Sequence, residues 1–256
     1  MPLEAQVLKV ADDYLELTSF HYQKMELESA LTQIHAGSGT RYNPRVVAAL
    51  DKNVKMYRDV RVESQLNVMR MMVKALDIKD NYTYRHSMDV RDMSLRIVDR
   101  LELSRSEREY MRITAELHDV GKIFIDEEIL NAPRKLTDDE FAIMKTHAAR
   151  SADLFRNVPG MDRLVAIVRA HHEKWNGSGY PDGLKGKDIP YLARIMALAD
   201  VWSALTTPRV YRIGEDGKAR KFTPQKALSI MEEMADGHFD PELYPVFESI
   251  VKEDFF

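Results

Sequence analysis

One short stretch restricts what this chain can fold into more than any other. Residues 115–122 read Ala-Glu-Leu-His-Asp-Val-Gly-Lys, so an apolar helical pattern ends in His118, Asp119 and Lys122. Burying such groups is costly unless they are paired or coordinate an ion. The stretch therefore predicts that a metal or an anion compensates these side chains inside the fold.

Four other segments with a helical pattern also carry a side chain that can bind a metal, on or beside an apolar face. These side chains are His86, His147, His171 with His172, and Asp200. The helix with His147 is opened by the capping-box residues Thr137 and Glu140, and Ser104 with Glu107 opens the helix that ends at His118. Alternating β-branched runs are missing, which predicts an all-α fold.

These side chains together predict a metal centre. Five histidines and two carboxylates exceed the roughly four ligands of one tetrahedral zinc. They suit two octahedral metals with Asp119 as the bridging ligand, and spacing leaves iron, manganese and zinc open. Such a pair is a hydrolytic device, because a bridging hydroxide can attack phosphorus. Lys122 then suits a phosphate oxygen.

Composition restricts the partners of the chain. Its 256 residues have a net charge of −4, so no general attraction to DNA, RNA or an anionic membrane is expected. The absence of cysteine excludes disulfides and thiolate metal sites and agrees with a reducing cytoplasm. The acidic N-terminus is unlike a signal peptide, and no apolar run approaches the roughly 20 residues of a membrane span. A cytoplasmic protein is expected.

The N-terminal segment repeats the end of the chain. At an offset of 188 residues, Ala11 and Asp12 match Ala199 and Asp200, and at an offset of 197, Pro44 matches Pro241. The change in offset is about the size of the polar loop 214–220. Two amphipathic helices that match by chance are the alternative.

A connecting helix is expected after this repeat. No helix breaker interrupts residues 44–76, and apolar residues recur at 4-3-4-3 spacing at Val62, Leu66, Met69, Val73 and Leu76. Such a stripe over 62–76 could form the seam of a homodimer. A helix packed on its own domain gives the same pattern.

Several of these stretches, in this order, resemble one known family. They are His118-Asp119-Val120-Gly121-Lys122, His171-His172, Gly179-Tyr180-Pro181, Ala199-Asp200-Val201 and Arg209-Val210-Tyr211-Arg212. Together they are similar to the HD-GYP family of the HD phosphohydrolase superfamily, over roughly residues 77–256. The resemblance implies an HD-domain helical bundle with a C-terminal HD-GYP extension.

The resemblance also implies an activity and the residues that perform it. HD-GYP proteins are bacterial signalling phosphodiesterases that degrade cyclic di-GMP, usually with a di-iron centre. Metal ligation is implied for His86, His118, Asp119, His147, His171, His172 and Asp200. Lys122 matches the lysine at the scissile phosphate, Tyr180 lies in the GYP loop, and Arg209 and Arg212 match positions that hold substrate phosphates. A pair of solvated arginines is the alternative for the last two.

The chain departs from the family pattern at three positions. Tyr82 stands where some members have a glutamate that supports a third metal, so two metals are expected. Ser203 replaces an aspartate three residues after Asp200, which puts the orientation of the site in doubt. Val210 replaces a proline, a milder change in loop stiffness.

These observations predict three parts and one leading function. Residues 1–55 are expected to be a truncated repeat of the HD-GYP tail that binds no metal, 56–78 a connecting helix, and 79–256 the HD-GYP domain. The leading function is metal-dependent hydrolysis of cyclic di-GMP to linear pGpG, with further cleavage to GMP open. A signalling adaptor with little turnover, and an HD phosphohydrolase acting on another cyclic dinucleotide or a nucleotide phosphate ester, are the alternatives.

Overall fold

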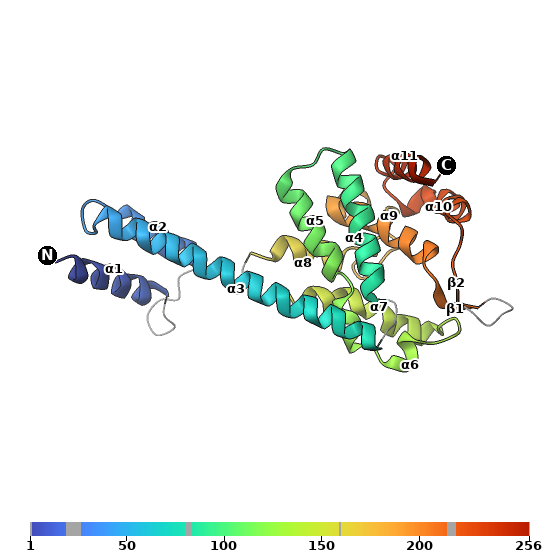
Figure 1. Cartoon of the computed structure of the whole chain (residues 1–256), viewed down its shortest axis with the longest axis horizontal. Helices are drawn as coiled ribbons and strands as arrows, with labels where there is room; N and C mark the ends of the chain where they lie inside the picture. The colour runs from blue at the N-terminus through green and yellow to red at the C-terminus, as the bar shows by residue number, and fades with distance from the viewer. Residues whose placement is uncertain (1, 19–26, 80–82, 159, 214–218, 256) are drawn as a thin grey trace. The chain divides into compact units, whose positions relative to one another are not determined.

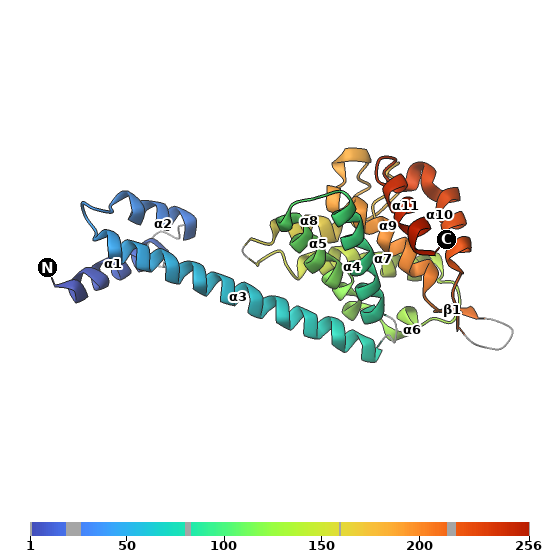
Figure 2. The ribbon, with the colours of Figure 1, turned by 45° about the horizontal axis from the view of Figure 1, so that its top comes forward.

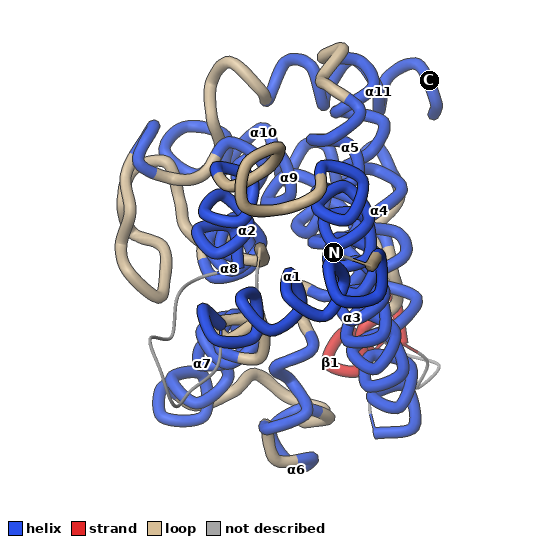
Figure 3. The backbone as a smooth tube through the Cα atoms, turned by 90° about the vertical axis from the view of Figure 1, so that its left-hand side faces the viewer, coloured by secondary structure: helices blue, strands red, loops and turns tan. Residues whose placement is uncertain are grey.

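The chain folds into two helical units. The computed structural model describes residues 2–18, 27–79, 83–158, 160–213 and 219–255. The first unit is Met1–Gln65 and the second is Leu66–Phe256, with the boundary inside one long helix. Helices make up most of the described backbone (Figures 1 and 3), so the predicted all-α class is confirmed. Among the described residues, no helix has the length and apolar character needed to cross a membrane.

The first unit contains three helices. They are α1 (Leu3–Thr18), α2 (Leu27–Ala36) and the first part of α3 (Pro44–Lys79), which Figure 2 shows together. One small core joins them through Val10 of α1, Ile34 of α2, and Tyr42, Val46 and Val47 at the start of α3. Other large apolar side chains of α1 stay exposed, among them Leu8 and Leu15.

The second unit contains the remaining elements. They are α4 (Thr83–Arg100), α5 (Arg105–Leu117), η1 (Val120–Phe124), α6 (Glu127–Leu130), α7 (Asp138–Asp153), α8 (Asp162–Arg169), η2 (Gly186–Asp188), α9 (Tyr191–Thr206), β1 (Arg209–Ile213), β2 (Ala219–Arg220), α10 (Pro224–His238) and α11 (Tyr244–Phe255). The two short strands pair antiparallel. The sequence did not predict this small hairpin, because a five-residue run has too little alternation to distinguish a strand from a loop.

Helix α9 lies at the centre of the second unit. It packs against α4, α5, α8 and α10. Most of its residues are buried, including Ile195, Met196 and Ala199, which have no exposed surface. Because residues from four neighbouring helices meet along α9, any side chain that α9 directs between them is removed from water.

The predicted capping signals position the helices around α9. Ser104 and Thr137 accept hydrogen bonds from Glu107 N–H and Glu140 N–H, and both capping boxes are complete. Thr223 caps α10, whose first residue is Pro224, and the helical angles of α10 break at Gly237. These caps fix the starts of α5 and α7, the helices that lead to His118 and His147.

The predicted connecting helix is part of α3. Of the apolar stripe over 62–76, Leu66 and Val73 are 4% and 2% exposed, whereas the side chains of Val62 and Leu76 lie outside the described residues. Burial of Leu66 and Val73 is what a helix packed on its own domain gives. The burial of these two residues within one chain does not support the predicted homodimer seam over 62–76.

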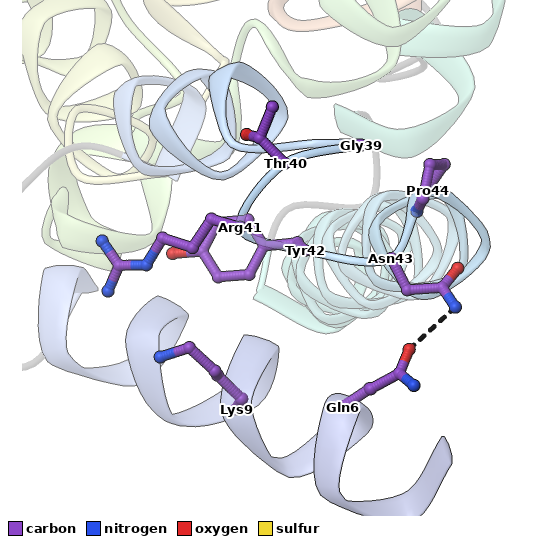
Figure 4. A pocket seen from close by; sticks show the side chains of 8 residues that line it. All are labelled: Gln6, Lys9, Gly39, Thr40, Arg41, Tyr42, Asn43 and Pro44. Carbon is purple, nitrogen blue, oxygen red and sulfur yellow. Dashed lines mark hydrogen bonds between the residues drawn. The ribbon is translucent and has the colours of Figure 1, made fainter. Parts of the chain in front are cut away.

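The helices of the first unit have counterparts in the second. The bounds of α1, shifted by 188 residues, are those of α9, and the start of α2, shifted by 197, is the start of α10. A side-chain pair coincides as well. Asn43 donates to Gln6 at 2.8 Å (Figure 4), and at the equivalent positions Arg194 donates to Asp240 at 2.5 Å.

This pair yields a stability prediction. Asp240 and the Arg194 side chain are nearly buried, at 1% and 11% exposure, so Asp240→Ala leaves a guanidinium without its partner. We expect a loss of about 3–5 kcal/mol. For Asn43→Ala we expect about 1–2 kcal/mol, because this change removes two neutral hydrogen bonds, one to Gln6 and one from Arg45 N–H. Chemical denaturation followed by circular dichroism measures the free energy of unfolding of both variants. Equal losses would contradict the expectation that the charged pair contributes more than the neutral pair.

Glu140 yields a prediction for acid stability. Its bonds with Arg134 and with the Thr137 backbone lower its pKa from 4.5 to about 2. A lowered folded-state pKa gives stability that is present above pH 4.5 and is lost as the pH falls toward 2. Glu140→Gln should therefore lower the melting temperature at pH 7 and match the wild type near pH 2. A deficit that stays constant over this range would show that the charge contributes nothing.

Candidate metal centre

The stretch around His118 lies at a helix end, as its sequence predicts. Helix α5 ends at Leu117, His118 is its C-cap, and Asp119 precedes the 3₁₀ helix η1. His118 and Asp119 are buried, at 0% and 2% exposure. The apolar face of α5 thus delivers both polar side chains into the interior of the second unit.

Gly121 holds this turn against α7. Its N–H donates to Ser151 Oγ at 2.7 Å. A Cβ at this position would lie 2.3 Å from the carbonyl oxygen of His147 and 2.5 Å from the Ser151 nitrogen. Glycine is therefore required here for close approach, which brings η1, and with it Asp119, next to His147.

The structure brings all seven predicted metal-binding residues together. His86 comes from α4, His118 and Asp119 from the α5–η1 junction, His147 from α7, His171 and His172 from the turn after α8, and Asp200 from α9. The helix predicted to include His171 ends at Arg169, with Ala170 as its cap. The prediction was wrong on that boundary, yet His171 is buried at 1% exposure.

The carboxylates lie among the imidazoles. Asp119 Oδ1 is 3.2 Å from His147 Nε2, and its Oδ2 is 3.4 Å from His118 Nε2 and 3.8 Å from His86 Nε2. Asp200 Oδ1 is 2.9 Å from His86 Nε2, and its Oδ2 is 3.5 Å from His172 Nδ1. Each carboxylate therefore reaches histidines from at least two different segments.

Three of the rings are oriented by their own helices. The Nδ1 atoms of His118, His147 and His171 lie 2.8, 2.8 and 2.5 Å from the carbonyl oxygens of the third residue before each. A carbonyl oxygen can accept a hydrogen bond but cannot donate one, so the Nδ1 atom that faces it must carry the proton. In the neutral ring Nε2 then keeps its lone pair. This is the tautomer in which Nε2 can bind a metal.

Local electrostatics set the charges of the cluster. Burial, reinforced by His118 and His147, lowers the pKa of His171 to about 3, and burial also lowers the pKa of His172. Burial alone would raise the pKa of Asp119, but Lys122 and His118 outweigh it and hold that pKa well below its usual range. Burial would lower the pKa of His118 as well, but Asp119 and Asp200 outweigh it and raise that pKa. The ionised carboxylate and the imidazoles form a donor set for a divalent cation, which displaces the proton of a ligand nitrogen when it binds.

A buried atom without a partner tests whether a cation fits. Among the described residues, His118 Nε2 is buried and has no hydrogen-bond partner, a rare and costly state for a polar atom. His147 Nε2 also lies 3.4 Å from His171 Nε2 and 3.1 Å from His172 Nε2. Converging nitrogens of this kind are satisfied by a metal ion.

The donors fall into two sets. One consists of Asp119, His147, His171 and His172, the other of His86, His118 and Asp119. Within each set one ligand atom per residue lies within 4.8 Å of the others. Asp119 belongs to both sets, the position expected of a bridging ligand between two cations.

Lys122 and Tyr180 lie at this cluster. Lys122 Nζ donates to Asp119 Oδ2 at 2.6 Å, and its side chain is 12% exposed. The Tyr180 ring is 4.8 Å from that of His172 and 6.4 Å from that of Phe141. Both predicted substrate residues therefore lie beside the histidines.

The loop with Tyr180 is held by a residue that the sequence reasoning did not single out. Glu173 is 2% exposed, and its Oε1 accepts from Asp182 N–H at 2.7 Å and Gly183 N–H at 3.0 Å. A Cβ at Gly179 would lie 2.4 Å from the backbone of Glu173 and Lys174. The signal that could have identified Glu173 is a carboxylate directly after two buried histidines.

Three sequence expectations concern residues without described side chains. Arg209 and Arg212 lie in β1, but their side chains are outside the described residues, as is all of Tyr82. Their roles stay predictions. Ser203, in contrast, is buried and lies 2.8 Å from His86 Nδ1 through its Oγ, so the doubt about orientation of the site has a structural answer.

Known proteins resemble this chain in sequence and in fold. The HD domain family matches residues 70–243. The 3'3'-cGAMP-specific phosphodiesterase 3 of Vibrio cholerae is 29% identical over 85% of this chain and 51% of its own length. A cyclic di-GMP phosphodiesterase of the same organism is 33% identical over 79% of this chain and 41% of its own length. The chain thus spans about half the length of these relatives or less.

One solved structure covers nearly the whole chain. It is a HDG"Y"P protein from Bdellovibrio bacteriovorus, with 15% identity and a TM-score of 0.55 over 98% of this chain and 78% of that one. At this identity the likeness concerns the fold.

The contact of Gly121 with α7 yields a prediction. Gly121→Ala places a methyl group against the backbone of His147 and Ser151, so we expect a lower melting temperature and less bound manganese. Ser151→Ala removes only the hydrogen bond and should cost about 1–3 kcal/mol while keeping the metal. Elemental analysis of both variants after manganese loading is the measurement. Full metal content in Gly121→Ala would contradict it.

Proposed function

Because this chain belongs to the HD domain family and gathers a buried His/Asp cluster, we propose that it is a metal-dependent cyclic dinucleotide phosphodiesterase of the HD-GYP type. The substrate we propose is cyclic di-GMP, cut to linear pGpG. The observation that carries the proposal is the cluster of Nε2 atoms around Asp119, with His118 Nε2 buried and lacking a hydrogen-bond partner among the described residues.

The residues that would hold two metal ions are those of the two donor sets, together with Asp200. We propose iron, with manganese or zinc as alternatives, since imidazole and carboxylate suit all three. When bound, such a pair supplies Lewis acidity and a water-derived nucleophile at neutral pH. The protein contributes by holding imidazoles and carboxylates at fixed, buried positions, which spares the reaction the reorganisation of solvent.

Lys122 is the residue that we assign to the scissile phosphate. Its Nζ lies 2.6 Å from Asp119 Oδ2, and the side chain remains partly exposed. The ammonium can therefore donate to a phosphate oxygen without leaving the cluster. Burial and the nearby carboxylates of Asp200 and Asp119 raise the pKa of Tyr180, so its hydroxyl stays a neutral donor for the substrate. Arg209 and Arg212 are proposed to hold the phosphates further out.

Two alternatives differ in what the site does. The named relatives include enzymes for cyclic di-GMP and for 3'3'-cGAMP, so 3'3'-cGAMP is the second substrate to test. An adaptor that binds cyclic dinucleotide with little turnover is suggested by the replacement at Ser203 and by the truncated N-terminal copy. The Ser203–His86 contact favours the enzyme, because the hydroxyl still orients His86.

We also propose a role for the N-terminal part. The coinciding helix bounds and the Gln6–Asn43 pair support the interpretation of residues 1–55 as a truncated copy of the HD-GYP tail, joined by residues 56–78 to the domain at 79–256. This copy has Asp12 exposed on α1 and no histidine segments equivalent to those around Asp200. It would therefore serve structure or regulation.

The activity proposal predicts a specific loss. Iron-loaded wild type should convert cyclic di-GMP to pGpG in a chromatographic assay. Asp119→Ala should lower the rate by more than about 100-fold, because it removes a ligand itself, and loss of a residue that only orients a ligand already costs up to about 100-fold. Lys122→Met should lose about 100-fold in kcat, typical of one charge-stabilising donor. Lys187→Met, at a surface ion pair with Glu242, is the matched control. Equal, negligible rates in wild type and Asp119→Ala would refute the activity.

A further inference from the structure

His86 is oriented differently from the other histidines of the cluster. His118, His147 and His171 use carbonyl oxygens of their own segments, whereas His86 Nδ1 lies 2.8 Å from the hydroxyl of Ser203 on α9. His86 is in the first turn of α4, because α4 begins at Thr83. The orientation of this ring therefore involves a contact between two helices.

One turn of α9 holds both nitrogens of the His86 ring. Asp200 Oδ1 is 2.9 Å from Nε2 and Ser203 Oγ is 2.8 Å from Nδ1. His86 and Ser203 are each 1% exposed, so water does not replace the contact. Because Asp200 and Ser203 are three residues apart, they lie on the same face of α9.

A hydroxyl suits this position because it can donate and accept. Without a metal, His86 Nε2–H can donate to Asp200 while Nδ1 accepts from Ser203. With a metal on Nε2, the ring needs its proton on Nδ1, and the Ser203 hydroxyl oxygen then accepts a hydrogen bond from Nδ1–H. The same side chain thus serves both tautomers with no change of position.

We propose that Ser203 is the positioning residue for one of the two metal ions. By orienting His86, it controls binding at the set of His86, His118 and Asp119. The contact of Ser203 that carries the inference is with His86, and His86 belongs to that set but not to the set of His147, His171, His172 and Asp119. This inference rests on the proposed two-metal function and adds that the two positions depend on different residues.

The surroundings of Ser203 provide matched variants. Ser203 also lines a cavity of about 700 Å³, together with Arg85, Trp202 and Lys221, so the extra methyl group of Ser203→Thr has space. Ser94, on the same helix as His86, has 0% exposure and an Oγ with no hydrogen-bond partner among the described residues. Ser94→Ala is therefore a control for removing a buried hydroxyl.

The test is manganese binding to the metal-free protein of 256 residues, measured by equilibrium dialysis and by electron paramagnetic resonance of coupled ion pairs. Wild type, Ser203→Thr and Ser94→Ala should bind two ions. Ser203→Ala should bind one ion normally and the second about 10–100-fold more weakly, with loss of the coupled signal. If Ser203→Ala does not fold, Ser203→Cys, a poorer hydrogen-bonding group of similar size, should weaken the second ion in the same direction.

The outcomes separate this inference from the function on which it rests. Two ions bound with wild-type affinity in Ser203→Ala or Ser203→Cys would overturn the role of Ser203 and leave the metal centre intact. Wild type that binds fewer than two ions would overturn the proposed metal pair itself. Equal weakening of both ions in Ser203→Ala would show a general structural effect and would also overturn the assignment to one position.

Discussion

The buried carboxylate of Asp119 is the constraint around which the second unit is organised. At 2% exposure it cannot be hydrated, so positive or donor groups must surround it. Lys122 supplies one such group from the same turn. His118 approaches from the C-terminal end of α5, and His147 approaches from within α7. Because the protein leaves further lone pairs in the cluster, a divalent cation completes it better than any side chain.

Helix α9 carries the second part of this arrangement. Its apolar residues pack against four neighbours, while Asp200 and Ser203 face the cluster and hold His86. Helix α1 has the same length, but Leu15, 59% exposed, stands where α9 has Ser203. Among its described residues α1 buries Val10, whereas α9 buries most of its length. Asp12, at the position equivalent to Asp200, is exposed, so α1 reproduces neither the packing nor the polar cluster of α9.

The loop after His172 is fixed without regular secondary structure. Glu173 accepts two backbone N–H groups of the loop, and Gly179 packs on the backbone next to Glu173. These contacts hold Tyr180 beside the His172 ring. The buried carboxylate of Glu173, the packing of Gly179 and the hydrogen bond from Tyr180 N–H to the His172 carbonyl together set the position of the residue proposed to meet the substrate.

The sequence by itself determined the helices, their capping boxes and which side chains would form the cluster, because periodicity, caps and buried polar residues are local signals. It misplaced the end of α8 and did not reveal Glu173 or the β1–β2 hairpin. Only the tertiary structure decided that Ser203 meets His86, since the two are 117 residues apart and their contact depends on how α9 packs on α4. Orientation of ligands depends on such distant contacts, which no local pattern records.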